Sequence, residues 1–300
     1  MHRGMIGGTR PTRAVLVGVL AVVLLGAVLA ARPSGGGADP TLAAERAGRL
    51  HDEATDAVTR LDALIAKLQA ALDAGRRGSA LVIDGDRSPR ADLMNAASSI
   101  AAASDEAALA AAAAARVDGT LSAVAPRHGA LPPGPSGPLF PGISAQFAAA
   151  AEAAVPFVAR RQATRQTLDA LADALAALGK DDPQRALTAL DRANVALDTV
   201  RDWENPPTVL PLWLDTTGQL LSAARRIATA SLAGDADAVA RAAHRYARAA
   251  DDANRADTAL AIAIAESGSS LASTPLQLLA DALEAATAQR EALQAILATD

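Results

Sequence analysis

Three histidines follow residue 32, and histidine is the side chain that most often acts as a metal ligand or as a base near neutral pH. Metal sites inside helical bundles place a glutamate three residues before a histidine, because that spacing brings both side chains to one helix face. None of His51, His128 and His244 has that glutamate, and the sequence contains no His-Glu-x-x-His pattern. We therefore predict solvated surface histidines, with no metal site and no cofactor.

The acidic segment Asp84-Gly85-Asp86 begins like a calcium-binding loop. Ser88 and Pro89 stand where such a loop needs its next oxygen ligand and its glycine, and no glutamate follows at the twelfth position. We predict a turn here rather than a calcium site.

Adjacent carboxylates occur three times, at Asp105-Glu106, Asp181-Asp182 and Asp251-Asp252. Neighbouring residues on a helix point about 100° apart, so these pairs do not converge on one substrate atom. We expect them to serve solubility and helix capping, with the ion pairs Asp251–Arg255 and Arg248–Asp252 on a solvated face. The sequence also contains no Gly-x-Ser-x-Gly motif and no phosphate-binding glycine loop. We therefore do not expect an enzyme.

Five of the six aromatic residues lie in or near two proline-containing breaks: Phe140, Phe147, Phe157, Trp203 and Trp213. The favoured interpretation is that these large rings plug the end of a helical bundle, where alanine cannot fill space. The alternative is a groove that binds a partner, because tryptophan is enriched in binding hot spots. The candidate residues for that groove are Trp203, Trp213, Phe147 and Phe157. We expect at least one tryptophan to be buried.

An uninterrupted apolar run from Ala14 to Ala31 determines where the rest of the chain goes. Its eighteen residues would span about 27 Å as a helix, which is close to the ~30 Å of a hydrocarbon core. An uncleaved membrane anchor is favoured, because no polar residue interrupts the run; a signal peptide cleaved near Ala30 is the alternative. The arginines around the run predict a cytoplasmic N-terminus and export of the remainder: Arg3, Arg10, Arg13 and Arg32.

The chain beyond residue 32 is acidic and contains no cysteine. It holds 24 basic and 33 acidic residues, a net charge near −9, which repels nucleic acid and anionic lipid headgroups. An exported chain without cysteine has no disulfides, so a hydrophobic core alone must hold the fold. With aromatic residues at 2% of the chain, that core must consist of leucine, valine, isoleucine and alanine.

Apolar residues recur every three or four positions over most of residues 40–300, which indicates amphipathic helices. The first helix is expected to begin at Pro40 and to stop at Gly75 and Gly78, with a connector over residues 79–87. Seven helices joined by short turns predict an all-α, elongated up-and-down antiparallel bundle behind the N-terminal hydrophobic helix. Two similar turns lie about 54 residues apart, which raises the alternative of a tetratricopeptide-like array. This alternative is less favoured, because that repeat has a period of ~34 residues.

Proline content divides the chain further. Residues 126–142 contain six of the sixteen prolines, so we expect a Pro/Gly-rich spacer loop there; docking to a proline-recognition domain is the alternative. The predicted segments are a cytoplasmic stub with the anchor or signal (1–32), a flexible linker (33–39), an N-terminal helical pair (40–125), this loop (126–142) and a C-terminal helical bundle (143–300).

These features favour a non-enzymatic, membrane-anchored interaction or spacer module of the cell envelope, with its bulk outside the cytoplasm. The alternative is an exported binder of a small ligand or peptide that uses the aromatic residues near Trp203 and Trp213. The expected partners are the membrane, through the N-terminal helix, and an envelope protein.

Overall fold

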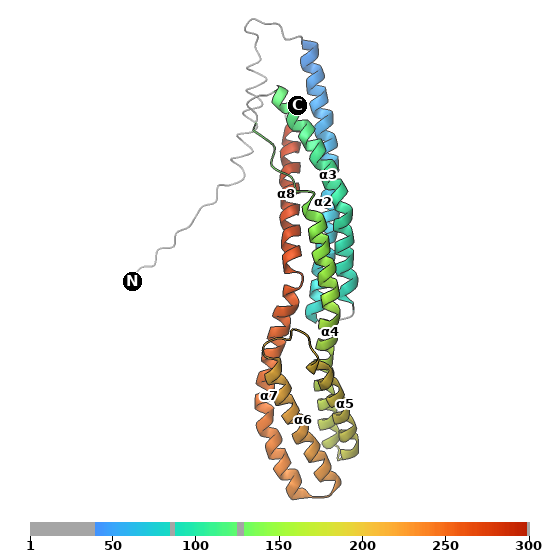
Figure 1. The fold of residues 1–300 in the computed structure, drawn as a ribbon, viewed down its shortest axis with the longest axis vertical. Coiled ribbons are helices and arrows are strands. Elements are labelled where there is room, and N and C mark those ends of the chain that lie inside the picture. The colour runs from blue at the N-terminus through green and yellow to red at the C-terminus, as the bar shows by residue number, and fades with distance from the viewer. Residues whose placement is uncertain (1–39, 85–87, 125–128, 299–300) are drawn as a thin grey trace, which may run out of the picture. The chain divides into compact units, whose positions relative to one another are not determined.

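The structure is a computed structural model that describes residues 40–84, 88–124 and 129–298. In this part of the chain every regular element is an α-helix, which confirms the all-α prediction (Figure 1). The predicted anchor and linker lie outside the described residues. The helices are α2 (Pro40–Asp84), α3 (Pro89–Val124), α4 (Leu139–Leu178), α5 (Pro183–Arg201), α6 (Leu210–Leu232), α7 (Ala236–Ser270) and α8 (Ser273–Leu297).

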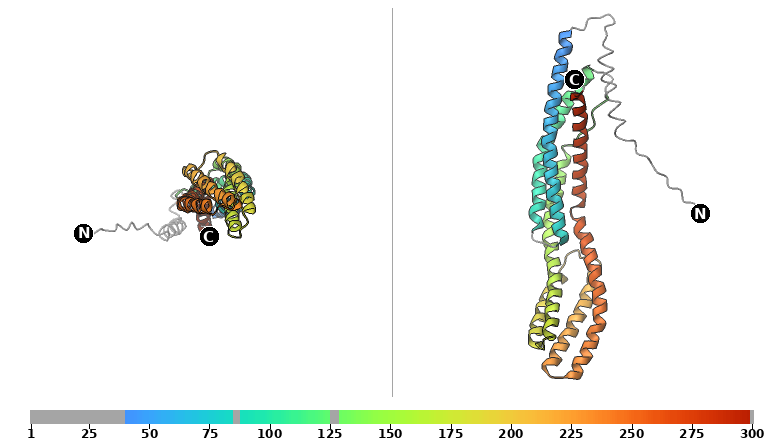
Figure 2. Two further views of the ribbon diagram at one scale, coloured as in Figure 1. Left: turned by 90° about the horizontal axis from the view of Figure 1, so that it is seen from below. Right: turned by 180° about the vertical axis from the view of Figure 1, so that it is seen from behind.

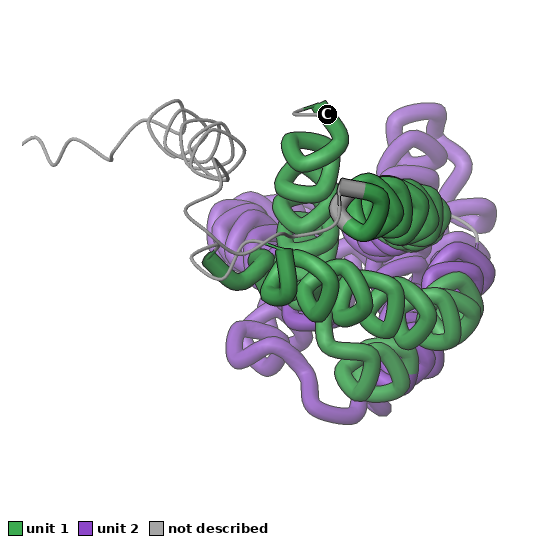
Figure 3. Tube along the Cα trace, turned by 90° about the horizontal axis from the view of Figure 1, so that it is seen from above, with its two compact units in different colours: residues 1–72, 97–144, 277–300 green, residues 73–96, 145–276 purple. Residues whose placement is uncertain are grey.

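The chain forms two compact units (Figure 3). Unit 1 comprises residues 1–72, 97–144 and 277–300, and unit 2 comprises residues 73–96 and 145–276. Each unit is therefore assembled from segments that are distant in sequence. The predicted boundaries at residues 125 and 143 instead follow the order of the chain, and that division stays a prediction.

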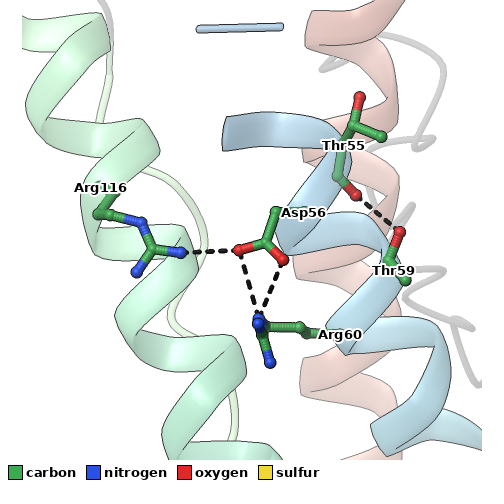
Figure 4. A network of polar contacts seen from close by, with 5 residues as sticks. All are labelled: Thr55, Asp56, Thr59, Arg60 and Arg116. Carbon is green, nitrogen blue, oxygen red and sulfur yellow. Dashed lines mark hydrogen bonds and ion pairs between the residues drawn. The ribbon is translucent and has the colours of Figure 1, made fainter. Parts of the chain in front are cut away.

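Unit 1 is built from α2, α3 and α8, which bury leucine and alanine against one another. Leu61, Leu64 and Leu68 repeat at helical spacing on α2 and are fully buried. Polar contacts at the edge of this core join the helices. In Figure 4, Asp56 of α2 accepts from Arg116 of α3 at 2.7 Å and also contacts Arg60 of its own helix.

Further charged contacts in unit 1 connect α2 with both of its neighbours. Lys67 Nζ lies 3.1 Å from Glu106 Oε2 on α3, and Arg290 of α8 forms an ion pair with Asp62 of α2. Glu106 is therefore one half of a cross-helix ion pair. Such part-exposed pairs contribute at most about 1 kcal/mol each, so the apolar core carries most of the stability.

The described part of the Pro/Gly-rich segment lies against helices of unit 1. The Leu131 backbone N–H donates to Asp118 of α3 at 3.2 Å, and Gln289 of α8 donates to the Pro132 carbonyl at 3.1 Å. A Cβ on Gly134 would lie 2.3 Å from Gln289 Oε1, so a larger residue there would require the Gln289 side chain to move. The loop predicted over 126–142 ends earlier than expected, because α4 already begins at Leu139.

Helix α2 does not stop at Gly75 and Gly78, as predicted, but continues to Asp84. Both glycines lie where a bulky side chain of unit 2 approaches the helix. A Cβ on Gly75 would lie 2.7 Å from the Phe147 ring, and one on Gly78 would lie 2.7 Å from Leu93 Cγ. The glycines therefore allow close packing within a helix rather than ending it, and the predicted connector is helical up to Asp84.

Unit 2 contains α5, α6, α7 and most of α4, joined by the short turns that the sequence predicts. Asp182 caps α5 by accepting from the Arg185 backbone N–H at 3.0 Å, and Asp235 caps α7 by accepting from the Ala238 N–H at 2.8 Å. The turn before Asp235 contains Gly234 with a φ of +67°, which favours glycine. Helices α6 and α7 run side by side in opposite directions (Figures 1 and 2).

Helices α3 and α4 are long and apolar enough to cross a membrane, judged by length and composition within the described residues. Of the most apolar window, 33% is buried inside the protein in α3 and 39% in α4. Both helices are alanine-rich and contribute buried residues to the cores, as the core helices of soluble proteins also do.

Candidate functional site

Phe157 and Trp203 form the floor of a surface hollow in unit 2. Phe157 comes from the middle of α4, and Trp203 from the break that follows α5. Their ring centroids are 5.5 Å apart with an interplanar angle of 79°, the edge-to-face arrangement that aromatic rings favour. Each residue is 8% exposed and therefore largely covered.

The hollow beside these rings has a volume of about 510 Å³, within the range of small-ligand sites. Its walls come from α4, the break after α5 and the end of α7. The lining residues are Ala153, Pro156, Phe157, Arg160, Trp203, Glu204, Asn205, Pro207, Ser267, Ser270 and Leu271. An aromatic floor with charged and hydroxyl groups around it suits a flat apolar group that carries a polar end.

Arg160 fixes the break after α5 against α4. Its guanidinium donates to the Thr199 carbonyl at 2.7 Å and to the Asp202 carbonyl at 3.2 Å. These carbonyls belong to the C-terminal turn of α5 and the residue after it, where helical carbonyls lack an intrahelical partner and the helix dipole is negative. The contacts place Trp203 next to Phe157, and Asn205, with a φ of +51°, turns the chain onward.

Arg161 plays a similar part for another helix end in unit 2. Its side chain donates to the carbonyl of Val82, in the last turn of α2, at 3.2 Å. Burial lowers the pKa of Arg161 below its ordinary value, and repulsion from Arg165 lowers it further, while Asp84 raises it. Two successive arginines of α4 thus cap the ends of two helices.

Gly268 of α7 brings the last wall of the hollow close to the rings. A Cβ there would lie 3.3 Å from the Phe157 ring and 3.3 Å from Val82, so a larger residue would require these side chains to shift by a few tenths of an ångström. The sequence patterns did not point to Ser267, Ser270 and Leu271 as site residues. The Gly-Ser-Ser run in this alanine-rich helix was the available signal for them.

The other aromatic candidates do not line this hollow. Trp213 is fully buried, and its indole N–H donates to Asp257 of α7 at 3.2 Å. Phe147 is fully buried, and its ring lies close to Gly75 of α2. The expectation that at least one tryptophan is buried therefore agrees with the structure. A partner-binding role for these four residues stays a prediction.

The described histidines and the carboxylate pairs are not among the residues that line the hollow. His51 and His244 are exposed, and His128 lies outside the described residues. No group of three histidine, aspartate or glutamate residues that could hold a metal ion occurs in the described ranges. On α7, Arg255 forms an ion pair with Asp252 at 2.6 Å. This pair differs from both predicted pairs, which were Asp251–Arg255 and Arg248–Asp252.

Comparisons of this chain with models of protein families, with curated proteins and with solved structures gave no match. The candidate site therefore stands on its geometry.

Proposed function

We propose that the chain is a non-enzymatic, membrane-anchored helical module that lies outside the cytoplasm, in the cell envelope, and acts there in protein interaction or as a spacer. The observation that carries this proposal is the eighteen-residue apolar run from Ala14 to Ala31, flanked by arginines and followed by an acidic helical chain. The run is the longest stretch in the sequence without a charged or polar side chain, and an apolar stretch of that length leaves water for a bilayer or a translocon.

The described helices support this proposal by their construction. They bury leucine and alanine along most of their lengths, and they place charged pairs at the edges of the packed faces. Helix α7 alone has 35 residues and so extends about 52 Å, which suits a module that holds partners apart. Up-and-down antiparallel packing behind the anchor, predicted from the short turns, belongs to the same proposal.

The proposal assigns the membrane segment to residues 14–31 rather than to α3 or α4. Each of these two helices has ionisable side chains within its apolar stretch, including Asp105 and Glu106 in α3 and Glu152 in α4. A charged residue at the centre of a membrane helix costs about 2.5–3.5 kcal/mol. Glu106 already has its partner, Lys67, on α2.

A second candidate function is binding of a small ligand or peptide outside the cytoplasm, and the hollow at Phe157 and Trp203 favours it. The hollow offers a volume suited to a small molecule and an aromatic floor. We assign this binding role to Trp203 rather than to Trp213, because Trp213 is enclosed and its indole N–H is already bound to Asp257.

Fractionation of cells that produce the chain tests the anchor. The full chain should sediment with membranes and resist extraction at alkaline pH, whereas a chain lacking residues 14–31 should be released. A soluble full chain would contradict the anchor, and loss of about 30 N-terminal residues by mass would then identify cleavage near Ala30. If the shortened chain still resisted extraction, α3 and α4 would be the membrane spans instead.

A further inference from the structure

Helices α6 and α7 of unit 2 border a groove that is rich in arginine. It consists of two adjoining hollows of about 610 and 580 Å³, which share Ser222, Arg226 and Arg245. This arginine groove is separate from the hollow at Trp203, since the two have no lining residue in common. Its five arginines are Arg201, Arg225, Arg226, Arg241 and Arg245.

Two of these arginines are engaged by carboxylates, and three are not. Arg201 lies 2.6 Å from Asp198, and Arg225 forms an ion pair with Asp191. The other three make no hydrogen bond or ion pair with any residue in the described part of the chain: Arg226, Arg241 and Arg245. All three are exposed, so their guanidinium groups are available to a ligand.

The two carboxylates that line the groove bond to neutral groups and not to its arginines. Asp215 accepts from Gln219 at 2.9 Å, and Asp235 accepts from the Ala238 backbone N–H at 2.8 Å. With Asp191 and Asp198 counted beside Asp215 and Asp235, five arginines stand against four aspartates. The groove charges left without a partner among the described residues are all positive: Arg226, Arg241 and Arg245. Unpartnered charges of one sign raise the local concentration of the opposite charge and steer a charged partner toward themselves.

We propose that the arginine groove binds an extended acidic peptide segment of a partner protein, with carboxylates at alternate positions. Arg241 and Arg245 are four residues apart on α7, so they are separated by about 6 Å along the helix axis. Carboxylates two residues apart in an extended peptide are separated by about 6.6 Å and point to the same side. Arginine pairs with carboxylates through two parallel hydrogen bonds, so one such peptide engages both side chains.

The shape and surroundings of the groove favour a narrow chain over a flat anionic surface. Exposed carboxylates flank the groove: Asp191 and Asp198 of α5 pair with Arg225 and Arg201, and Asp237 stands one helical turn before Arg241 on α7. A planar anionic membrane would have to approach all of them, whereas a narrow extended peptide can lie between α6 and α7. Two connected hollows also exceed what a single phosphate ion would fill.

This inference rests on the proposed interaction module and gives it a partner chemistry. It is tested with the full chain in micelles of a neutral detergent. The probe is a fluorescein-labelled twelve-residue peptide in which glutamate and glycine alternate, and fluorescence anisotropy reports its binding. Inorganic phosphate and vesicles of phosphatidylglycerol are the comparison ligands, and failure of the peptide to bind would leave the fractionation result unchanged.

The arginine variants provide the direct test. Arg226→Gln and Arg245→Gln should each weaken binding of the peptide about threefold to tenfold, and the double variant by more than tenfold, with binding weakening as salt is added. Arg255→Gln is the matched control, because it removes the same charge from α7 outside the groove and should change the affinity less than twofold. Helical circular dichroism and the Tm of each variant verify folding.

Three results would overturn the proposal. The first is unchanged affinity in the double variant, and the second is an equal loss in Arg255→Gln, which would show an effect of net charge alone. The third is binding of phosphatidylglycerol vesicles or phosphate, but not of the peptide, in a manner that depends on Arg226 and Arg245. That outcome would assign the arginine groove to a lipid headgroup or a free anion.

Discussion

Replacing Trp213 with alanine should lower the free energy of unfolding by about 3–5 kcal/mol. The ring is fully buried in unit 2, where its loss leaves a cavity that the surrounding helices cannot fill. Its indole N–H also donates to Asp257, so the variant loses a hydrogen bond to a carboxylate as well. Urea unfolding of the full chain in micelles, followed by circular dichroism at 222 nm, measures the change.

Two matched variants divide this effect and separate the candidate functions. Trp213→Phe keeps a ring but removes the indole donor, so its cost should be smaller than that of alanine. Trp203→Ala should also cost less, because Trp203 lines the hollow and is partly exposed, whereas Trp213 is fully buried. If Trp203→Ala also abolished the fluorescence of anilinonaphthalene sulfonate bound to the protein, this result would support a ligand-binding function at the hollow. An unchanged unfolding curve for Trp213→Ala would contradict the packing described for unit 2.

Gly75→Leu should destabilise the protein by about 1–3 kcal/mol or more, although leucine favours helices more than glycine does. A Cβ at this position would lie 2.7 Å from the ring of Phe147, which is itself fully buried. Because the ring is enclosed by the protein, the added atoms are expected to force side chains away from their preferred rotamers. The same urea unfolding experiment measures the loss.

Gly48→Ala is the control for that variant, because it is exposed on the same helix with no atom within 4 Å of the added Cβ. Alanine there should stabilise the protein by about 0.5–1 kcal/mol through helix propensity alone. Opposite signs for the two substitutions are the expected result. Stabilisation by Gly75→Leu would show that Phe147 does not pack against α2 as described.

Helix boundaries that depend on local chemistry were predictable from the sequence. The starts of α5 and α7 follow from Asp182 and Asp235, because an aspartate side chain satisfies the free N–H groups of the first turn. Heptad-like spacing of leucine on α2 likewise identifies Leu61, Leu64 and Leu68 as core residues. These features depend on residues within one or two turns of each other.

Features that depend on distant segments were not predictable. Gly75 and Gly78 resemble a helix stop in the sequence, and only the approach of Phe147 and Leu93 explains why the helix continues through them. The composition of the two units from alternating segments of the chain is a tertiary property of the same kind.

The candidate sites show the same division. The sequence pointed to the aromatic residues as a group, but packing in three dimensions separates Trp203 and Phe157 from the enclosed Trp213. The arginine groove was not predictable from the sequence, because its arginines come from three helices and the chain as a whole is acidic. Only the spatial arrangement shows which arginines lack a neighbouring carboxylate.

Labelling of single cysteines in intact spheroplasts tests the central claim of export most directly. The natural chain contains no cysteine, so a membrane-impermeant maleimide has no background. Ser122→Cys in α3 and Thr188→Cys in α5 place exposed thiols in unit 1 and unit 2, and Thr9→Cys places one before the apolar run. We predict labelling at 122 and 188 in intact spheroplasts, and at 9 only after lysis. Labelling of all three only after lysis would contradict export and the proposed function with it.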